Sequence, residues 1–412
     1  MLPLALTTAL LLSTYGQADA PTAEDFRDAP DCAFLHAYDP GPEGVFALER
    51  EIALLACRLP QPGDAETLAG EILQERRFGF RVEGDVLTIA ANPADGEAVS
   101  VTGALPGAEL DPAGEDGLFL SRFRLAHLDE GVLGFYLFEN LQTLAEGEDP
   151  EPVQLVSWRG PNAPAEPEFD PELQGTLEEV ELWSEALGET RRLVIYTPPG
   201  FDPEGEYPAV FFADGGKVQF YARYIEPMIR EGRVEPLVLV GARSGQGGIV
   251  EDRSDIHRDM RNADYIPGFV DETPRFDQHM EFFAEELVSH AVEAYAVTTD
   301  RRRRAVTGRS SGGAFAFLAG VQRPDAFGLA FPMSGGWGVE DIPQASEDSA
   351  IFRLASGRYE MSFMLRARRS VQLLAPAGYD IELQEISAGH TQEIDDYGLL
   401  PLLQEFFPAS QP

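Results

Sequence analysis

Two hydrophobic patterns divide the chain. In the first, short runs of alternating apolar and polar residues are separated by Gly, Pro and Asp, which is typical of antiparallel strands with one buried face. These runs are Phe78–Val82, Val86–Ile89, Ala98–Val101, Leu118–Leu125 and Val132–Phe138. Short strands at this spacing predict a β-sandwich.

The second pattern begins near residue 190, where the apolar runs no longer alternate, as in strands buried on both faces. These runs are Arg192–Tyr196, Ala209–Phe212, Leu237–Val240 and Ala305–Thr307. Between them lie stretches with apolar residues three and four apart, such as 282–296, which predict helices. Alternating strands and helices predict an α/β fold with a mostly parallel sheet and helices on both faces.

A proline-rich segment separates the two patterns. Residues 146–171 are rich in Pro, Glu and Gly, which predicts an extended linker or a terminal strand that runs into one. We therefore predict a smaller β-rich N-terminal domain over residues 21–160 and an α/β domain over residues 172–412.

The first twenty residues predict export. An apolar run from Leu2 to Leu12 is followed by Ala18-Asp19-Ala20, which is the arrangement of a secretory signal peptide, although residues 1–20 contain no Lys or Arg. The expected location is therefore periplasmic or secreted. In an exported protein, Cys32 and Cys57 are expected to form one disulfide, worth about 3 kcal/mol. Two buried free thiols are the alternative.

The charge balance excludes several classes of partner. The chain has 70 Asp and Glu against 31 Lys and Arg, a net charge of -39. Such a surface repels nucleic-acid phosphates and anionic lipid heads, so we expect no nucleic-acid partner. No stretch is long and apolar enough to span a membrane. The two cysteines have no paired ligand spacing around them, so no metal site is predicted, and no oligomeric state is predicted either.

A nucleophile turn is predicted at Ser310. Gly308-Arg309-Ser310-Ser311-Gly312 has the G-x-S-x-G pattern, with a predicted strand before it and a predicted helix after it, over 314–321. This context lets a serine project from a sharp turn while the helix N-terminus faces the developing oxyanion. Ser310 is the candidate nucleophile, and the Ser311 N–H is a candidate oxyanion donor.

His390 is the candidate base. It lies on a Gly-containing loop after the predicted strand Ile381–Ile386, near the C-terminus, where the Ser–acid–His chain order requires a histidine. The other five histidines lie in the N-terminal domain or precede Ser310, and we interpret them as surface or packing residues. They are His36, His127, His257, His279 and His290.

The acid of a triad holds the imidazole tautomer and stabilises imidazolium, and it is expected on the loop after the preceding strand. Ile351–Ala355 predicts that strand, and Glu360 is the first carboxylate beyond it. The competing carboxylates lie before this strand or at the start of the next one. They are Asp341, Glu347, Asp348 and Asp380.

The second oxyanion donor is expected after an early central strand. Ala209–Phe212 runs into Asp214-Gly215-Gly216-Lys217, so the backbone N–H of Gly216 or Lys217 is a candidate partner for that of Ser311. A plain β-turn is the alternative interpretation.

Several motifs together resemble the esterase D-like family of α/β-hydrolases, which includes enterochelin (siderophore) esterases, feruloyl esterases and mycolyltransferases. They span about residues 172–408: Ser184 to Gly188, Arg191 to Phe201, Tyr207 to Val210, Arg261 to Tyr265, Phe283 to Leu287, Gly308 to Gly313 and Gly357 to Glu360. Two positions depart from the family pattern, because Asp264 replaces Glu and Gln392 stands where many members have Trp. The β-rich N-terminal part is similar, more loosely, to the N-terminal sandwich of enterochelin esterases.

The resemblance implies an α/β-hydrolase that needs no metal or organic cofactor. In that family the sandwich helps to shape the substrate pocket. The net charge disfavours an anionic siderophore unless arginines such as Arg261 and Arg309 line the entrance. Trp337 is either a pocket wall or a packed core residue, and the long segment 242–269 is expected to cap the pocket.

The predicted function is therefore a serine carboxylic-ester hydrolase acting on a small-molecule or glycan-linked ester, with a siderophore or another bulky ester as the leading candidate. A feruloyl or acetyl carbohydrate esterase and an acyltransferase use the same residues. A binding protein on an inactive hydrolase fold is the alternative from another class. Because every candidate catalytic residue lies beyond position 200, we expect the catalytic machinery to be complete without the N-terminal domain. We expect that domain to bind the parts of the substrate that are remote from the scissile bond.

Overall fold

The computed structural model describes residues 33–34, 55–94, 98–105, 108–114, 117–139, 153–245, 260–269, 274–336 and 342–409. The signal peptide predicted at 1–20 lies outside these residues. Cys57 is disulfide-bonded, and Cys32, the other cysteine of the sequence, also lies outside them.

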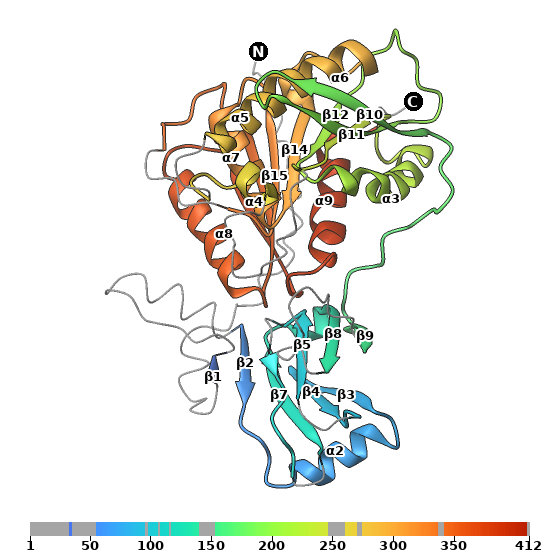
Figure 1. Cartoon of the computed structure of the whole chain (residues 1–412), viewed down its shortest axis with the longest axis vertical. Coiled ribbons are helices and arrows are strands. Elements are labelled where there is room, and N and C mark those ends of the chain that lie inside the picture. Colours follow the sequence, from blue (N-terminus) through green and yellow to red (C-terminus); the bar gives the residue numbers. More distant parts are fainter. Residues whose placement is uncertain are drawn as a thin grey trace, which may run out of the picture.

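The N-terminal domain contains two antiparallel sheets (Figure 1). The first has the strand order β1-β2-β7-β4-β3, with β1 (Ala33–Phe34), β2 (Ala56–Leu59), β3 (Phe78–Glu83), β4 (Val86–Ala91) and β7 (Phe119–Leu125). The second has the order β6-β5-β8-β9, with β5 (Val99–Gly103), β6 (Ala108–Glu109), β8 (Val132–Glu139) and β9 (Gln154–Arg159). Apolar side chains of both sheets share one buried cluster, including Ile89, Phe123 and Phe135. The five predicted strands are confirmed.

Two short helical elements also belong to this domain, the helix α2 (Ala65–Leu73) and the 3-10 turn η1 (Leu128–Glu130). Within the described residues, the proline-rich segment contains the strand β9, which pairs with β8, and then a linker, because residues 160–175 hold no helix or strand.

The larger C-terminal domain contains one eight-stranded mixed sheet with the order β10-β11-β13-β12-β14-β15-β16-β17. The strands are β10 (Thr176–Ser184), β11 (Glu189–Thr197), β12 (Ala209–Phe212), β13 (Val238–Ala242), β14 (Arg304–Arg309), β15 (Leu329–Met333), β16 (Ile351–Gly357) and β17 (Ile381–Ile386). The β10–β11 and β11–β13 pairs are antiparallel, and every other pair in this sheet is parallel.

Helices cover both faces of this sheet, because successive residues of its strands point into two different apolar clusters. Ile195 and Phe211 pack in one cluster, with side chains from a first group of helices. Tyr196 and Phe212 pack in the other cluster, with side chains from a second group of helices. The first group consists of α5 (Arg275–Glu281), the π-helical turn η5 (Phe282–Leu287), α6 (Val288–Tyr295), α7 (Ser311–Gln322) and α8 (Met361–Leu374). The second consists of α3 (Val218–Arg230) and α9 (Glu393–Phe406).

Three short helical elements follow strand ends or loops: η3 (Gly215–Lys217), α4 (Met260–Tyr265) and η6 (Arg301–Arg303). Within the described ranges, no helix combines the length and apolarity that a membrane crossing requires. Since the carboxyl ends of parallel strands meet at one edge of a sheet, the loops after β12, β14, β16 and β17 are brought to the same edge. These four loops carry the candidate triad residues and the candidate oxyanion donors that the sequence analysis selected.

Candidate active site

Ser310 occupies a strained turn between β14 and α7. Its backbone has φ 61° and ψ -123°, a conformation that non-glycine residues rarely adopt. The glycines around it are required by close packing, since a Cβ on Gly308 would lie 2.6 Å from the Gly312 carbonyl carbon. A Cβ on Gly312 would lie 2.8 Å from Asp214 Oδ2. The turn therefore presents the serine at the head of a helix, as the G-x-S-x-G pattern predicted.

Glu360 and His390 form a hydrogen-bonded pair. Glu360 is 4% exposed, and its Oε2 lies 2.6 Å from His390 Nδ1. The other oxygen, Oε1, accepts hydrogen bonds from Ser356 Oγ at 2.7 Å and from the Gly357 N–H at 2.6 Å. These bonds fix the carboxylate so that it can hold the imidazole with a proton on Nδ1 and leave Nε2 to accept one.

The competing carboxylates that the structure describes are exposed or pair with other residues. Asp348 is exposed and pairs with Arg301 at 3.0 Å, and Asp380 pairs with Arg353 at 2.8 Å. Glu347 is exposed, and Asp341 lies outside the described residues. Glu360 is thus the carboxylate that the fold brings to His390.

The His390 ring is oriented by stacking as well as by Glu360. It lies on Phe363 of α8 with ring centroids 4.1 Å apart and planes 8° from parallel. No hydrogen bond joins Ser310 Oγ to His390 within the described part of the chain, and such bonds commonly tighten only when substrate binds.

An ion-pair cluster ties the serine, histidine and oxyanion loops together. Asp395, which is buried on α9 shortly after His390, lies 3.3 Å from Lys217 Nζ and 3.5 Å from a guanidinium nitrogen of Arg309. Lys217 Nζ also donates to Gln392 Oε1 at 2.6 Å. Because Arg309 directly precedes Ser310, this cluster brings all three predicted loops together.

The predicted oxyanion donors differ in availability. The Lys217 N–H donates to the Asp214 carbonyl at 2.9 Å within η3, so it is already used in the turn. Gly216 N–H and Ser311 N–H are the two remaining candidates. The oxyanion loop is also packed closely against the end of β13, because a Cβ on Gly215 would lie 2.6 Å from the Ala242 carbonyl carbon.

The residues expected to bind substrate have other partners in the structure. Arg261 makes a bidentate pair with Asp214 at 2.7 and 2.9 Å, and it also donates to the Arg309 carbonyl at 3.3 Å. The Arg309 guanidinium faces Asp395, as described above. Arg261 therefore joins the nucleophile turn to the oxyanion loop, and Arg309 joins it to α9. Trp337 and residues 246–259 of the expected cap lie outside the described residues.

The helix α4 contributes two contacts that the sequence analysis did not foresee. Asn262 Oδ1 accepts a hydrogen bond from Ser311 Oγ, and the Tyr265 hydroxyl donates to the Ala213 carbonyl. The only signal for them was the resemblance of Arg261 to Tyr265 to a family element. Their common effect is to hold α4 against both the nucleophile turn and the oxyanion loop.

Asp264 joins α4 to β11 and α5 through ion pairs. It is fully buried and accepts hydrogen bonds from Arg191 at 2.9 Å, from Arg275 at 2.6 Å and from the Gly245 N–H at 2.8 Å. Burial acts to raise the pKa of Asp264, but the attraction of His279, Arg191 and Arg275 outweighs it and lowers the pKa.

We expect Asp264→Asn to lower the free energy of unfolding by about 3 to 5 kcal/mol at pH 7, because it removes the buried carboxylate that Arg191 and Arg275 share and leaves them only the partly exposed Glu189. Since the folded-state pKa is depressed, this contribution is present above the unfolded pKa and is lost as the pH falls through the folded value. Urea unfolding followed by fluorescence measures it. Asp325→Asn, which breaks an exposed pair with Arg323, is the matched control and should cost less than about 1 kcal/mol. Equal losses in the free energy of unfolding for Asp264→Asn and Asp325→Asn would contradict the stabilising role of the buried Asp264 carboxylate.

Asp396 is a second carboxylate with an altered environment. Burial and the charge of neighbouring Asp395 raise its pKa from 3.8 to about 6, against the opposing hydrogen bond from Gln392. Its ionised form is therefore disfavoured in the folded protein. Ionisation costs stability as the pH rises from the unfolded to the folded pKa.

We expect Asp396→Asn to stabilise the protein by up to about 3 kcal/mol at pH 8, where the wild-type carboxylate is charged. The gain should shrink as the pH falls through 6 and should be nearly absent at pH 4. Thermal unfolding of both proteins across this range tests the expectation. A variant that is less stable than the wild type at pH 8 would contradict it.

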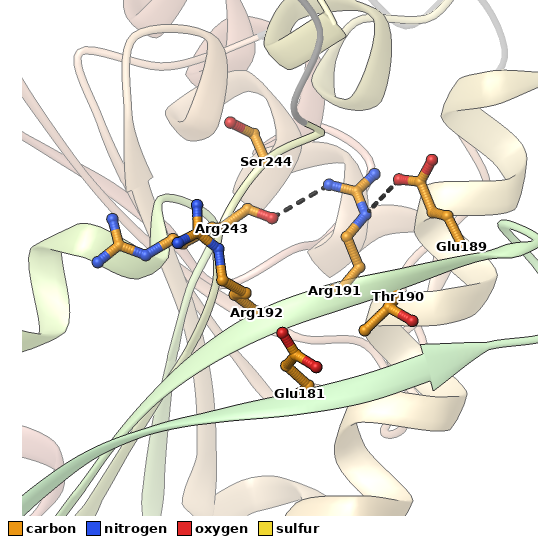
Figure 2. A pocket seen from close by; sticks show the side chains of 7 residues that line it. All are labelled: Glu181, Glu189, Thr190, Arg191, Arg192, Arg243 and Ser244. Carbon is orange, nitrogen blue, oxygen red and sulfur yellow. Dashed lines mark hydrogen bonds and ion pairs between the residues drawn. The ribbon is translucent and has the colours of Figure 1, made fainter.

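A polar cavity of about 320 Å³ lies beside the oxyanion loop, at the start of β11 and the end of β13. Figure 2 shows Arg191 held between Glu189 and the Arg243 carbonyl, at 2.8 and 3.0 Å. A Cβ on Gly216 would lie 3.5 Å from an Arg243 guanidinium nitrogen, so the cavity borders this loop. Arg192, which lines the cavity, has no ion pair within the described ranges. The cavity therefore places both arginine and glutamate side chains close to Gly216, and the Arg243 guanidinium pairs with Glu179.

Comparison with known proteins agrees with this geometry. Residues 184–360 match a family described as "Putative esterase". Two uncharacterised proteins of Bacillus subtilis (strain 168) align with the chain: YbbA is 25% identical over 41% of the chain and 66% of its own length, and YjcH is 24% identical over 37% and 59%. The chain thus spans less than two thirds of the length of each.

Among solved structures, the enterobactin esterase FES of Shigella flexneri, determined in the presence of enterobactin, superposes with a TM-score of 0.56. It is 16% identical and aligns over 81% of this chain and 96% of its own. At this identity the match concerns the fold, in which a smaller antiparallel domain precedes a larger mixed-sheet domain. The resemblance predicted from the sequence is therefore confirmed: the chain is similar to esterases of the α/β-hydrolase type, with an enterochelin (enterobactin) esterase among its structural neighbours.

Proposed function

We propose that the protein is a serine carboxylic-ester hydrolase that works through an acyl-enzyme. The observation that carries the proposal is the contact of 2.6 Å between the buried Glu360 and His390, on loops that reach the same sheet edge as the strained Ser310 turn. A strained serine and an oriented imidazole are the two components that an activated nucleophile requires.

In the proposed reaction, Ser310 Oγ attacks the ester carbonyl carbon while His390 Nε2 takes the hydroxyl proton. The negative charge that develops on the carbonyl oxygen is stabilised by the N–H groups of Gly216 and Ser311. The protonated His390 then gives its proton to the leaving alkoxide, and an acyl-serine remains. Water then attacks the acyl carbon while His390 Nε2 takes a proton from it. The bond between the acyl carbon and Ser310 Oγ breaks, His390 returns the proton to Ser310 Oγ, and the acid is released. Glu360 stabilises the imidazolium in both halves without taking its proton.

The proposed substrate is a bulky ester with a polar or anionic substituent. A net charge of -39 repels anions at long range, so such a group needs a local cationic site. We propose that the cavity beside Gly216 provides it through Arg192, because the Arg243 guanidinium already pairs with Glu179. The likeness to the enterobactin esterase makes a siderophore ester the first candidate, and feruloyl and acetyl carbohydrate esters are the alternatives. We also propose export, on the signal-peptide pattern of residues 1–20.

A panel of substrates tests the proposal: p-nitrophenyl acetate, a feruloyl ester and a catecholate siderophore lactone, each with and without an added alcohol acceptor. Hydrolysis of at least one ester, with free acid as the main product, supports the hydrolase. Transfer to the alcohol as the main product would identify an acyltransferase. A protein that turns over none of them and also resists a fluorophosphonate probe would be a binding protein on this fold.

A further inference from the structure

The loop that carries His390 is packed directly on the N-terminal domain. The His390 N–H donates to the carbonyl of Gly103, at the end of β5, over 3.2 Å. The preceding residue, Gly389, lies so close to Ala104 that a Cβ at position 389 would be 2.3 Å from the Ala104 Cα and from its carbonyl oxygen. The backbone position of His390 is therefore set by the segment that follows β5.

The loop that carries Glu360 is anchored in the same domain. The preceding residue, Tyr359, is 1% exposed and belongs to the buried cluster that both N-terminal sheets share. Its hydroxyl donates to the Ala126 carbonyl at 2.8 Å. Its N–H donates to the Ala388 carbonyl at 3.1 Å, which joins the acid loop to the histidine loop.

Three further contacts surround this junction. The Val132 N–H, at the start of β8, donates to the Ser387 carbonyl at 2.9 Å. Arg358 pairs with Glu130 at 3.0 Å and donates to Ser387 Oγ at 2.6 Å. Figure 1 shows the N-terminal domain, in blue and cyan, below the α/β domain and next to the lower ends of α8 and α9.

We infer that the N-terminal domain positions the catalytic acid and base, with Gly103 and Ala104 setting His390 and Ala126 setting Glu360 through Tyr359. The inference rests on the proposed esterase function. It replaces the expectation that the catalytic machinery is complete without this domain. His390 Nε2 must be placed within a few tenths of an ångström of its productive position relative to the Ser310 hydroxyl. Turnover of every ester therefore depends on the junction, including esters too small to touch the N-terminal domain.

The test is Gly389→Ala in the full-length protein, with p-nitrophenyl acetate as the substrate. The added methyl group must displace the histidine loop from Ala104. We expect kcat to fall about 100-fold while KM stays within about twofold, and the acidic limb of the pH profile to move. Gly70→Ala in α2 is the matched control, because nothing lies within 4 Å of a Cβ there, and it should leave kcat unchanged.

If Gly389→Ala does not fold, Tyr359→Phe replaces it, because this variant keeps the buried ring and loses only the hydroxyl that donates to Ala126. It should lower kcat about fivefold without raising KM. An unchanged kcat for the small ester in whichever folded variant is measured would overturn the inference, even if a bulky ester were affected. Ser310→Ala, run in parallel, reports separately on the proposed function, since activity that survives in it would refute the triad whatever position 389 shows.

Discussion

Ser310→Ala should lower kcat for p-nitrophenyl acetate by about 10⁴- to 10⁶-fold. Nucleophile and base act as a unit, so removing the nucleophile alone costs nearly as much as removing the whole triad. The remaining activity would come from the oxyanion donors and from substrate binding. Alanine differs from serine only by the missing hydroxyl at this φ of 61°, so the turn and the thermal stability should change little.

Ser346→Ala is the matched control for this prediction. Ser346 is exposed, and its hydroxyl only accepts a hydrogen bond from the Asp348 N–H. The control should keep full activity. Retention of more than a hundredth of the wild-type rate in Ser310→Ala, with contaminating esterase excluded, would refute the nucleophile assignment.

Glu360→Gln should lower kcat by about 10³-fold, and His390→Ala should lower it further. The Glu360 carboxylate accepts from Ser356, from the Gly357 N–H and from the His390 Nδ1–H. A glutamine side chain has one accepting oxygen, so at least one of these N–H or O–H donors would face an amide NH₂. The unsatisfied donor disturbs the tautomer of His390, and the imidazolium loses the charge that stabilises it.

The control for Glu360→Gln is Asp348→Asn, which changes the exposed carboxylate that pairs with Arg301. It should leave turnover unchanged. Steady-state kinetics of Glu360→Gln, His390→Ala and Asp348→Asn measure the order of the losses in kcat. A larger loss in Asp348→Asn than in Glu360→Gln would show that the wrong loop has been assigned.

Local patterns predicted the strands well, because their signals lie within a few residues. The run Ala209–Phe212 coincides with β12, and the alternating N-terminal runs coincide with strands of two antiparallel sheets. β10 was not predicted, because an exposed edge strand such as Thr176–Ser184 carries few apolar residues. The helix α2 was also missed, since its apolar face lies within a sequence otherwise interpreted as strands and turns.

Candidate chemistry was predictable where a motif combines residue type with chain order. Ser310, Glu360 and His390 were selected in that way, and the structure brings Glu360 and His390 into contact. The partners of Arg261 and of the Lys217 N–H were not predictable, because they depend on how loops from different strands meet. The contact between Gly103 and His390 joins two domains, and no local pattern encodes it.

The most direct test of the central claim is to trap the acyl-enzyme. The protein would be mixed with p-nitrophenyl acetate, quenched in acid within the first turnovers, digested and analysed by mass spectrometry. The account predicts an added acetyl group on the peptide that contains Ser310, its absence in Ser310→Ala, and its accumulation in a variant of His390 that deacylates slowly. Acetylation at another residue, or rapid hydrolysis with no adduct in any of these proteins, would contradict it.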